Sequence, residues 1–254
     1  MSKIRRKLLE FKKKQEQIVC VTCYDASFSK ILDELNIDIV LVGDSLGMVI
    51  MGDHNTHNVT LNESIYHTSC VAKNKNNFIL MSDMPKDSYE DSAIAIKNAT
   101  KLLDCDADIV KIEFKKDHID VVKKLISKEI PVCCHLGYLP QYALSKEDVK
   151  VYGKSSNEYN SILEQAILLD NLGVDLILLE CVDEKLSKLI SDTLKVPVIG
   201  IGSGKFCDGQ VQVLYDVIGI SSNPPKFSKN YLTGSLSIKD AIKEFYNYVK
   251  NIKN

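Results

Sequence analysis

The chain has 254 residues, a formal net charge of −2 at pH 7, 45% hydrophobic residues and 26% charged residues. This length and composition are typical of a soluble globular protein with a core the size of one (β/α) barrel. The small negative charge argues against a nucleic-acid-binding function, and no apolar run is long enough to span a membrane. We therefore expect a cytoplasmic protein with small-molecule partners.

The chain opens with the basic segment KIRRKLLEFKKK at 3–14. Ile4, Leu8 and Phe11 lie on one stripe of an amphipathic helix, and the charged residues occupy the remaining face. This pattern predicts a leading helix within residues 1–17 that packs on one side and is solvated on the other. It lacks the uninterrupted apolar core of a signal peptide, and we favour it over a nucleic-acid-binding arm.

After this segment, strand and helix patterns alternate to the end of the chain. Apolar runs predict strands over 18–24, 38–44, 78–83, 108–113, 131–135, 174–180, 196–201 and 211–218. Helical spacing predicts helices near 26–36, 62–73, 91–104, 117–128, 157–172 and 183–194, and a last helix within 236–252. The eighth strand is ambiguous, because its segment DGQVQVLYDVIG is also compatible with a helix.

Eight strands alternating with helices in a chain of this length indicate an α/β protein, a (β/α)₈ TIM-type barrel with a leading N-terminal helix. No linker or change of composition divides the chain. We expect residues 1–254 to form a single barrel domain, closed by the last helix.

Eight cysteines raise the question of metal or disulfide chemistry, and Cys20 and Cys23 have the CxxC spacing. Both lie in the apolar run IVCVTCYD, and positions three apart on a strand face opposite sides. Two sulfurs so placed cannot readily share one ion. We expect reduced, mostly buried thiols.

Five of the apolar runs end in an ionisable side chain. These are Asp44, Asp83, Glu113, His135 and Glu180. Because the carboxyl ends of parallel strands meet at one edge, the five side chains should gather at one mouth of the barrel, where ligands bind. Four carboxylates and a histidine there predict a metal site with a catalytic base beside it. Capping of the following helices could account for one or two of the aspartates, but Glu and His are poor caps.

The fourth run, IVKIE, places Lys111 and Glu113 on one face, directed into the barrel, while Val110 and Ile112 face the helices. A structural buried ion pair is the alternative to a functional interpretation. Oxygen donors from Asp44, Asp83 and Glu113 favour Mg²⁺ over Zn²⁺. Such an ion could chelate an α-keto acid and stabilise its enolate.

In this interpretation Lys111 neutralises the substrate carboxylate or the developing oxyanion. Apolar surroundings would raise the pKa of Glu180 and suit it to proton transfer. Two long loops, 45–61 and 136–156, could form substrate walls at the same mouth or be solvated excursions. The glycine-rich GIGSG at 200–204 is compatible with a phosphate cradle or with tight turns.

Together these residues resemble the ketopantoate hydroxymethyltransferase family. The matching motifs are VGDSLG at 42–47, VT and YHT within 59–68, SDMP at 82–85, KIE at 111–113, CHLG at 134–137, LLEC at 178–181, GIGSG and CDGQV within 200–211, and PKF at 225–227. They run in order from about Leu9 to Tyr231 and are highly specific in combination.

The resemblance implies a Mg²⁺-dependent (β/α)₈ barrel and a ring-type homo-oligomer. The implied reaction transfers a hydroxymethyl group from 5,10-methylenetetrahydrofolate to 3-methyl-2-oxobutanoate, giving 2-dehydropantoate on the route to pantothenate. Carried onto matching positions, it makes Asp44 and Asp83 metal ligands, with Glu113 near the metal directly or through water. Asp44, Ser45, Asp83 and Lys111 would contact the keto acid, and Glu180 would accept its proton.

The chain departs from the family pattern at three places, which read Lys86-Asp87, Phe114-Lys115 and Tyr215-Asp216. Each departure could alter the folate cleft, substrate affinity or oligomer contacts. One alternative function is a Mg²⁺-dependent enzyme of the isocitrate lyase and phosphoenolpyruvate mutase type, but the 136–156 loop lacks the cysteine often found there. Another is a non-catalytic binding barrel, which would not need all the charges at the mouth.

Overall fold

The computed structural model describes residues 3–145 and 148–253. Its eight strands are all parallel and close into a barrel, because β8 pairs with β1 as each earlier strand pairs with the next. The strands are β1 Ile18–Thr22, β2 Ile39–Val42, β3 Ile79–Asp83, β4 Ile109–Glu113, β5 Val132–Gly137, β6 Leu176–Glu180, β7 Val198–Ile201 and β8 Gly209–Gln212. The predicted (β/α)₈ barrel is confirmed.

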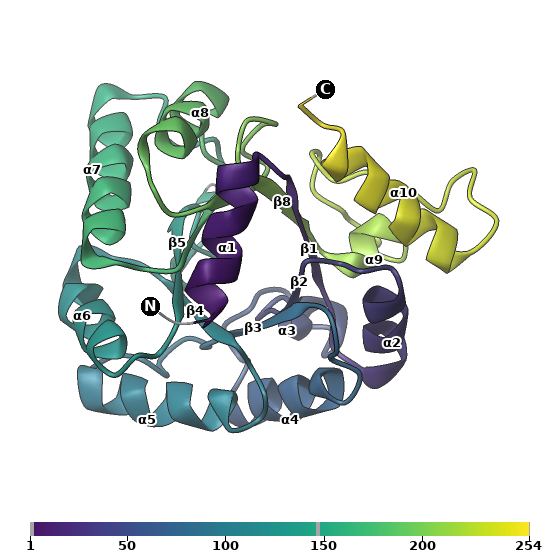
Figure 1. Cartoon of the computed structure of the whole chain (residues 1–254), viewed down its shortest axis with the longest axis horizontal. Helices are drawn as coiled ribbons and strands as arrows, with labels where there is room; N and C mark the ends of the chain where they lie inside the picture. Colours follow the sequence, from purple (N-terminus) through teal and green to yellow (C-terminus); the bar gives the residue numbers. More distant parts are fainter. Residues whose placement is uncertain (1–2, 146–147, 254) are drawn as a thin grey trace.

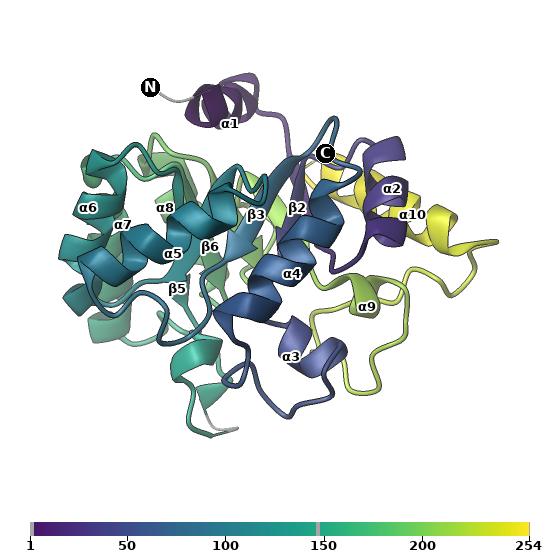
Figure 2. The ribbon, with the colours of Figure 1, turned by 90° about the horizontal axis from the view of Figure 1, so that it is seen from below.

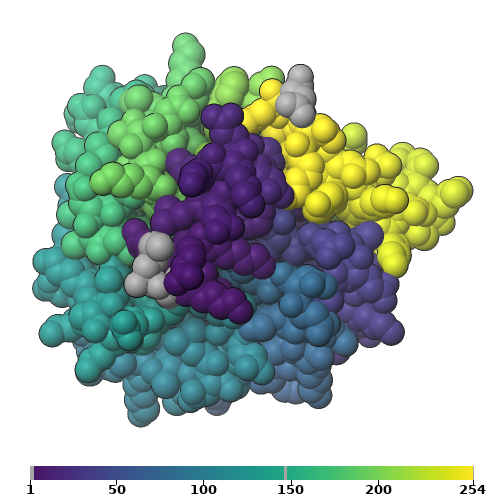
Figure 3. All heavy atoms as spheres, in the orientation of Figure 1, coloured from purple at the N-terminus to yellow at the C-terminus, as the bar shows by residue number. Residues whose placement is uncertain are grey.

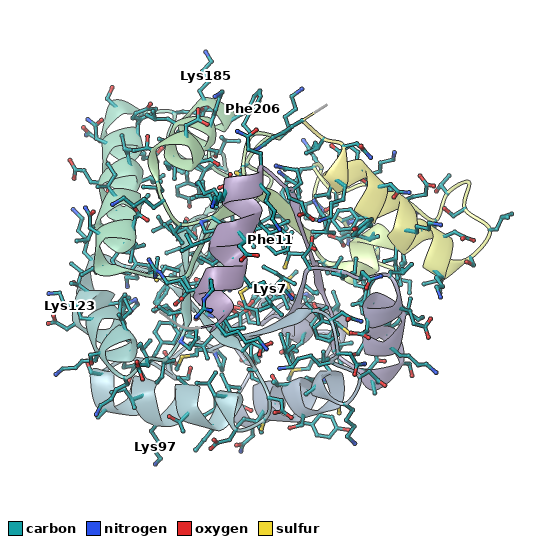
Figure 4. All side chains as sticks on the ribbon, viewed as in Figure 1. Lys7, Phe11, Lys97, Lys123, Lys185 and Phe206 are labelled. Atoms are coloured by element: carbon teal, nitrogen blue, oxygen red, sulfur yellow. The ribbon has the colours of Figure 1, made fainter. Side chains whose placement is uncertain are left out.

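Helices surround the barrel and connect its strands (Figure 1). They are α1 Lys3–Lys14, α2 Ala26–Glu34, α3 Leu46–Val49, α4 Leu61–Ala72, α5 Ser92–Leu103, α6 Ile119–Ser127, α7 Ser156–Leu172, α8 Glu184–Thr193, α9 Leu214–Val217 and α10 Ile238–Lys250, with 3₁₀ turns η1 Lys116–His118 and η2 Pro140–Tyr142. Charged side chains on this outer ring point away from the barrel, as Lys97, Lys123 and Lys185 do in Figure 4.

Alternate residues of each strand pack into different apolar clusters. Ile18 and Cys20 of β1 lie in the interior cluster, whereas Val19, Val21 and Cys23 pack between sheet and helices. Cys20 and Cys23 therefore face opposite sides, as the strand spacing predicts. All eight cysteines are free, and six of them are buried, so the expected thiol state is confirmed.

The leading helix α1 covers one open end of the barrel (Figures 1 and 2), and Figure 3 shows it spread across that face. Leu8 is fully buried in the interior cluster, with Ile4 and Phe11 partly buried beside it. The Arg5 guanidinium donates to the main-chain carbonyl of Val174 (2.7 Å). The Lys12 ammonium donates to the Ser191 carbonyl (2.7 Å). Two basic side chains of this helix thus bind main-chain carbonyls of α8 and of the loop before β6.

The Lys12 ammonium also donates to the Val196 carbonyl (3.0 Å) and pairs with the Asp208 carboxylate at 2.8 Å. Asp208 in turn accepts the main-chain N–H of Val198 at 2.9 Å. This end of the barrel is therefore closed by an apolar plug and by charges that have partners.

The prediction of a strand over 211–218 is wrong in its bounds. Strand β8 starts two residues earlier and ends at Gln212, and the next residues form the short helix α9. The main chain of β8 lies so close to β1 that a Cβ on Gly209 would stand 2.3 Å from the Ile18 carbonyl oxygen. The Thr22 hydroxyl accepts the Leu214 N–H at 3.0 Å, which fixes the start of the helix. Among the described residues, no helix is both long and apolar enough to cross a membrane.

Candidate functional site

The carboxyl ends of the strands meet opposite α1, at the end of the barrel where α3 lies (Figure 2). The strand register places Asp83 beside Lys111 and Glu113 beside His135, with Glu180 at the end of the next strand. Lys111 and Glu113 point inward, since Val110 and Ile112, which alternate with them along β4, pack in the outer cluster. The gathering of ionisable side chains at one mouth, predicted from the strand ends, is what the structure contains.

Asp83 connects two neighbouring strands. Its Oδ1 accepts from the Lys111 ammonium in a buried ion pair, and its Oδ2 accepts the main-chain N–H of Asp44 at 2.9 Å. The Lys111 side chain is only 5% exposed and that of Asp83 1%. Lys111 thus forms a buried ion pair, the alternative considered from the sequence, and its partner is Asp83 on the neighbouring strand. This pairing fixes the ammonium at the centre of the mouth.

His135 lies between two glutamates. Its Nδ1 is 3.7 Å from Oε1 of Glu113, and its Nε2 is 3.3 Å from Oε2 of Glu180. Neither ring nitrogen has a hydrogen-bond partner, and neither has Oε1 of Glu113, although all three atoms are buried. Burial, aided by the Lys111 ammonium, holds the pKa of His135 well below its usual value. The histidine is therefore neutral near pH 7 and gives neither glutamate a compensating positive charge.

Glu180 closes β6, and its side chain is 19% exposed toward the mouth. Burial raises the pKa of Glu180 to about 8, although the Lys111 ammonium opposes that shift. A carboxylate with a pKa near the working pH is both partly ionised and basic enough to take a proton from carbon. Among the mouth carboxylates, Glu180 is thus suited to proton transfer.

With all its carboxylates ionised, the mouth would hold excess negative charge. Among the described residues, four carboxylates, those of Asp44, Asp83, Glu113 and Glu180, share the single ammonium of Lys111. Burial would lower the pKa of Lys111, but the carboxylates of Asp83, Asp44 and Glu113 raise it. Burial raises the pKa of Asp83 to about 7 and that of Glu113 well above its usual value, with Asp44 adding to both shifts. Such a site stabilises an added cation.

No three His, Cys, Asp or Glu side chains are grouped closely enough to form a complete metal cage, within the part of the chain that the structure describes. Mg²⁺ does not require one, because it usually takes one or two carboxylates and completes its octahedron with water and substrate oxygens. Asp44 and Asp83 provide hard oxygen donors from adjacent strands, and Oε1 of Glu113 is a buried, unpartnered third. The donor chemistry therefore fits Mg²⁺.

Ser45 follows Asp44 at the start of α3 and is half-buried. Its hydroxyl lies 2.7 Å from the hydroxyl of Tyr24, a residue that carries no charge to mark it in the sequence. The capping alternative does not apply to Asp44, because α3 has no side-chain cap. Side-chain caps occur instead at Asp25, before α2, and at other aspartates outside the site.

Sequence reasoning missed Gln141, which lies in η2 and is fully buried. Its amide Nε2 donates to Oδ2 of Asp44 (2.9 Å) and to the Met84 carbonyl (3.1 Å). Its main-chain N–H donates to Oε2 of Glu113 (3.0 Å), and its Oε1 accepts from the Tyr89 hydroxyl (2.6 Å). No local signal identifies a glutamine in a loop as part of a site formed by distant strands.

The loops at this mouth touch each other. Nε2 of His57, from the loop after β2, lies 3.0 Å from the Pro140 carbonyl oxygen of η2. Residues 136–156 are therefore a wall of the site, although 146–147 lie outside the described residues. In the GIGSG segment, Gly202 and Gly204 have φ of +61° and +78°. A Cβ on Gly204 would meet Glu184 at 2.3 Å, so the tight-turn interpretation holds there.

The second and third departures from the family pattern, Phe114-Lys115 and Tyr215-Asp216, lie outside the carboxylate cluster. Phe114 is buried in the outer apolar cluster, and the Lys115 ammonium lies 4.2 Å from the Tyr142 ring centroid. Both residues line a cavity of about 480 Å³ that also reaches Gly137, the residue in register with Glu180. The third departure, Tyr215, packs against the ring of Tyr24 at a centroid distance of 6.0 Å.

Known proteins resemble the chain over nearly its whole length. The family model described as ketopantoate hydroxymethyltransferase matches residues 3–253. A 3-methyl-2-oxobutanoate hydroxymethyltransferase of Ruthia magnifica subsp. Calyptogena magnifica is 42% identical over 245 residues, which cover 96% of this chain and 94% of that protein.

Solved structures show the same fold at low identity. Phosphonopyruvate hydrolase in complex with oxalate and Mg++ superimposes with a TM-score of 0.62 at 8% identity, covering 84% of this chain and 81% of that one. A 2,3-dimethylmalate lyase, a PEP mutase/isocitrate lyase superfamily member, gives 0.61 at 10% identity, covering 83% and 80%. At these identities the likeness extends to the barrel fold alone.

Proposed function

The chain belongs to the ketopantoate hydroxymethyltransferase family, and we propose that it uses 5,10-methylenetetrahydrofolate as donor and Mg²⁺ as cofactor. It is an enzyme that transfers a hydroxymethyl group, with 3-methyl-2-oxobutanoate as the acceptor in the name of its relatives. Family membership decides between the transferase and the two alternative functions weighed from the sequence. The finer proposal concerns how the mouth residues divide the work.

The observation that carries this proposal is the charge imbalance at the mouth. Four carboxylates surround one ammonium, and Oε1 of Glu113 is buried without a partner. A buried carboxylate oxygen of this kind lowers stability unless a cation or a donor joins it. An enzyme that must stabilise negative charge on a keto acid has a use for a cation at that place.

We assign the metal to the oxygen donors of Asp44 and Asp83, with Glu113 close to it directly or through water. When bound, Mg²⁺ would supply a Lewis acid for the negative charge that develops on the keto-acid oxygens. Phosphonopyruvate hydrolase, a protein of the same fold, was solved in complex with oxalate and Mg++, and this agrees with the choice of metal.

The keto acid would lie against Asp44, Ser45, Asp83 and Lys111. The Lys111 ammonium is held in place by Asp83, so it can neutralise the substrate carboxylate without losing further side-chain freedom. The Ser45 hydroxyl, oriented by Tyr24, offers a hydrogen bond to the same substrate. These contacts orient C3 of the keto acid toward the rest of the mouth.

Glu180 would accept the C3 proton, so that this carbon can form the new C–C bond to the one-carbon unit of the folate. The two bonds from that carbon to the folate nitrogens break, water supplies the hydroxyl oxygen, and tetrahydrofolate leaves. The pKa of Glu180, about 8, makes it a stronger base than an ordinary carboxylate while leaving part of it ionised near neutrality. His135 is neutral, and its Nε2 lies 3.3 Å from Oε2 of Glu180. It would donate a hydrogen bond to Glu180 when that group is ionised and accept one when Glu180 is protonated.

The direct test is turnover of 3-methyl-2-oxobutanoate with 5,10-methylenetetrahydrofolate, measured with Mg²⁺ and after removal of divalent ions by a chelator. We expect activity that is lost on chelation and restored by Mg²⁺. Asp44→Ala and Asp83→Ala should both abolish the Mg²⁺-supported reaction without unfolding the protein. Unchanged Mg²⁺ and keto-acid binding by calorimetry in these variants would place the metal elsewhere.

We further propose a cytoplasmic single-domain protein that assembles into a ring-type homo-oligomer, as its family resemblance implies. Several large apolar side chains are exposed on the isolated chain, including Met48 at 50%, Leu144 at 91% and Leu236 at 99%. Burial of such residues in an assembly would be favourable. Sedimentation velocity of the purified chain would measure the assembly directly, and a monomer at micromolar concentration would refute it.

A further inference from the structure

Gln141 is a buried polar residue that contacts two of the three carboxylates assigned to the proposed metal position, those of Asp44 and Glu113. It is supplied by η2, a loop segment 28 residues from Glu113 and 97 residues from Asp44 in the sequence. Its side chain is 0% exposed. A fully buried glutamine requires hydrogen-bond partners for its amide, and here one partner is a site carboxylate.

The orientation of the amide is determined by its neighbours. Nε2 faces two groups that can only accept, the Asp44 carboxylate and the Met84 carbonyl. Oε1 faces the Tyr89 hydroxyl at 2.6 Å, which donates to it. The reverse orientation would set an oxygen against two oxygens, so the amide is held in one state.

Gln141 also restricts how each carboxylate can act. The amide engages Oδ2 of Asp44, which leaves Oδ1 as the oxygen that Gln141 does not hold. The main-chain N–H engages Oε2 of Glu113, and the remaining Oε1 is buried without a partner. In this way, one residue leaves one oxygen of each carboxylate for a ligand. Pre-orientation of this kind lowers the entropy lost when a ligand binds.

Tyr89 extends this arrangement by one residue. Its hydroxyl donates to Gln141 and accepts the main-chain N–H of Glu113 at 3.3 Å, so it connects the glutamine to the β4 strand end. The Tyr142 hydroxyl lies 3.5 Å from that of Tyr89, but Tyr142 contacts neither carboxylate. The two tyrosines thus form a matched pair: the Tyr89 hydroxyl contacts Gln141 and the Glu113 main chain directly, and the Tyr142 hydroxyl is connected to them only through Tyr89.

We propose that Gln141 is the positioning residue of the keto-acid site, holding Asp44 and Glu113 so that each presents a single oxygen to the bound ligand. The inference rests on the proposed function, because that ligand is the Mg²⁺ and keto-acid pair. Gln141 acts through the two carboxylates, so its loss should weaken ligand binding in addition to turnover.

The test replaces Gln141 with Met, which keeps the length of the side chain and removes its amide. Binding of Mn²⁺, as a spectroscopic substitute for Mg²⁺, is titrated by electron paramagnetic resonance with and without 3-methyl-2-oxobutanoate. We expect affinity to fall about 10–100-fold, the range seen when a residue that orients metal ligands is removed. Tyr89→Phe should weaken binding in the same direction by a smaller factor, and Tyr142→Phe should leave it unchanged.

The outcomes separate the two claims. If the wild type binds neither Mn²⁺ nor the keto acid, both the proposed function and this inference are overturned. If the wild type binds both and Gln141→Met binds them equally well, only the inference is overturned, and a lowered melting temperature would leave Gln141 a purely structural residue. Should Gln141→Met fail to fold, equal affinities of the Tyr89→Phe and Tyr142→Phe variants overturn it instead.

Discussion

The two ends of this barrel use charged residues in opposite ways. At the end covered by α1, the Lys12 ammonium pairs with the Asp208 carboxylate at 2.8 Å and also donates to two carbonyls. At the other end, four carboxylates share the Lys111 ammonium, and buried atoms of Glu113 and His135 have no hydrogen-bond partner. Both ends belong to the same eight strands, so the fold does not impose the difference.

The comparison indicates where function lies. Paired charges at the covered end contribute to stability and leave nothing for a ligand to satisfy. Carboxylates that ionise without a partner at the open end would lower the stability of the ligand-free protein, and the proposed cation and keto acid would compensate them. Substitutions at the covered end should therefore lower the free energy of unfolding and leave turnover unchanged. Substitutions at the open end should mainly lower turnover.

The largest effect is expected for Glu180→Gln, which keeps the size of the side chain and removes its basic oxygen. Loss of a general base typically lowers a rate by ~10²–10⁴. Exchange of the C3 proton of 3-methyl-2-oxobutanoate with deuterated solvent, followed by NMR without folate, isolates the proton-transfer step. The variant should still bind Mg²⁺ and keto acid.

Exchange at the wild-type rate would assign the base to another residue. His135 would then be the next candidate, since its Nε2 lies 3.3 Å from the Glu180 carboxylate. A His135→Gln variant tested in the same assay would distinguish the two.

A somewhat smaller effect is expected for Lys111→Met. This substitution keeps the stem of the side chain and deletes the ammonium that pairs with Asp83 among the four carboxylates. The transition state should lose about 2–4 kcal/mol of stabilisation, the range for removal of one electrostatic stabiliser. Steady-state kinetics with varied keto acid would measure it as a fall in kcat/KM. Wild-type kinetics in the variant would mean that Lys111 is only a structural ion-pair partner of Asp83.

The contrast between the two ends was only partly predictable from sequence. Apolar runs that end in a charge located Asp44, Asp83, Glu113, His135 and Glu180, because a parallel barrel brings every strand end to one mouth. The partner of Lys111 was not predictable, since it depends on the register between β3 and β4. The end of β8 was missed because the apolar residues around Leu214 fit a period of 2 and a period of 3.6 alike.

Gln141 could not be predicted from the sequence, for a different reason. Its contacts with Asp44 and Glu113 exist only after the η2 loop has folded over the mouth, and glutamine carries no charge that would mark it. The role of the leading lysines was equally hidden. A basic amphipathic helix has the same sequence pattern whether its ammonium groups meet solvent or, like that of Lys12, main-chain carbonyls that are distant in sequence.

At the covered end, Lys12→Met should lower stability and leave turnover intact. It removes an ammonium that is largely buried and leaves the Asp208 carboxylate with one donor fewer. We expect a loss of about 1–3 kcal/mol in the free energy of unfolding, measured by urea denaturation. Lys13→Met, one residue along the same helix and exposed, is the control and should have no effect. A folded Lys12→Met enzyme with reduced kcat would contradict the division between the ends.

The smallest effect is a pH-dependent change in melting temperature, and it tests whether the open end is destabilised by uncompensated charge. Burial raises the pKa of Glu180 to about 8, well above that of an unfolded glutamate. Between the two pKa values the folded protein binds more protons than the unfolded chain, so stability falls as pH rises across that interval. Above about pH 8 the carboxylate is ionised in both states, and the penalty is complete. Removing that carboxylate in Glu180→Gln should therefore change the melting temperature little at pH 5 and most at pH 9.

In metal-free protein we expect the variant to melt about 2–4 °C above the wild type at pH 9, which corresponds to about 1 kcal/mol for a chain of this size. Scanning calorimetry with a chelator at several pH values measures the difference. A variant less stable than the wild type at pH 9 would mean that the Glu180 carboxylate is compensated in the free protein, and the two ends of the barrel would then not differ in the way described.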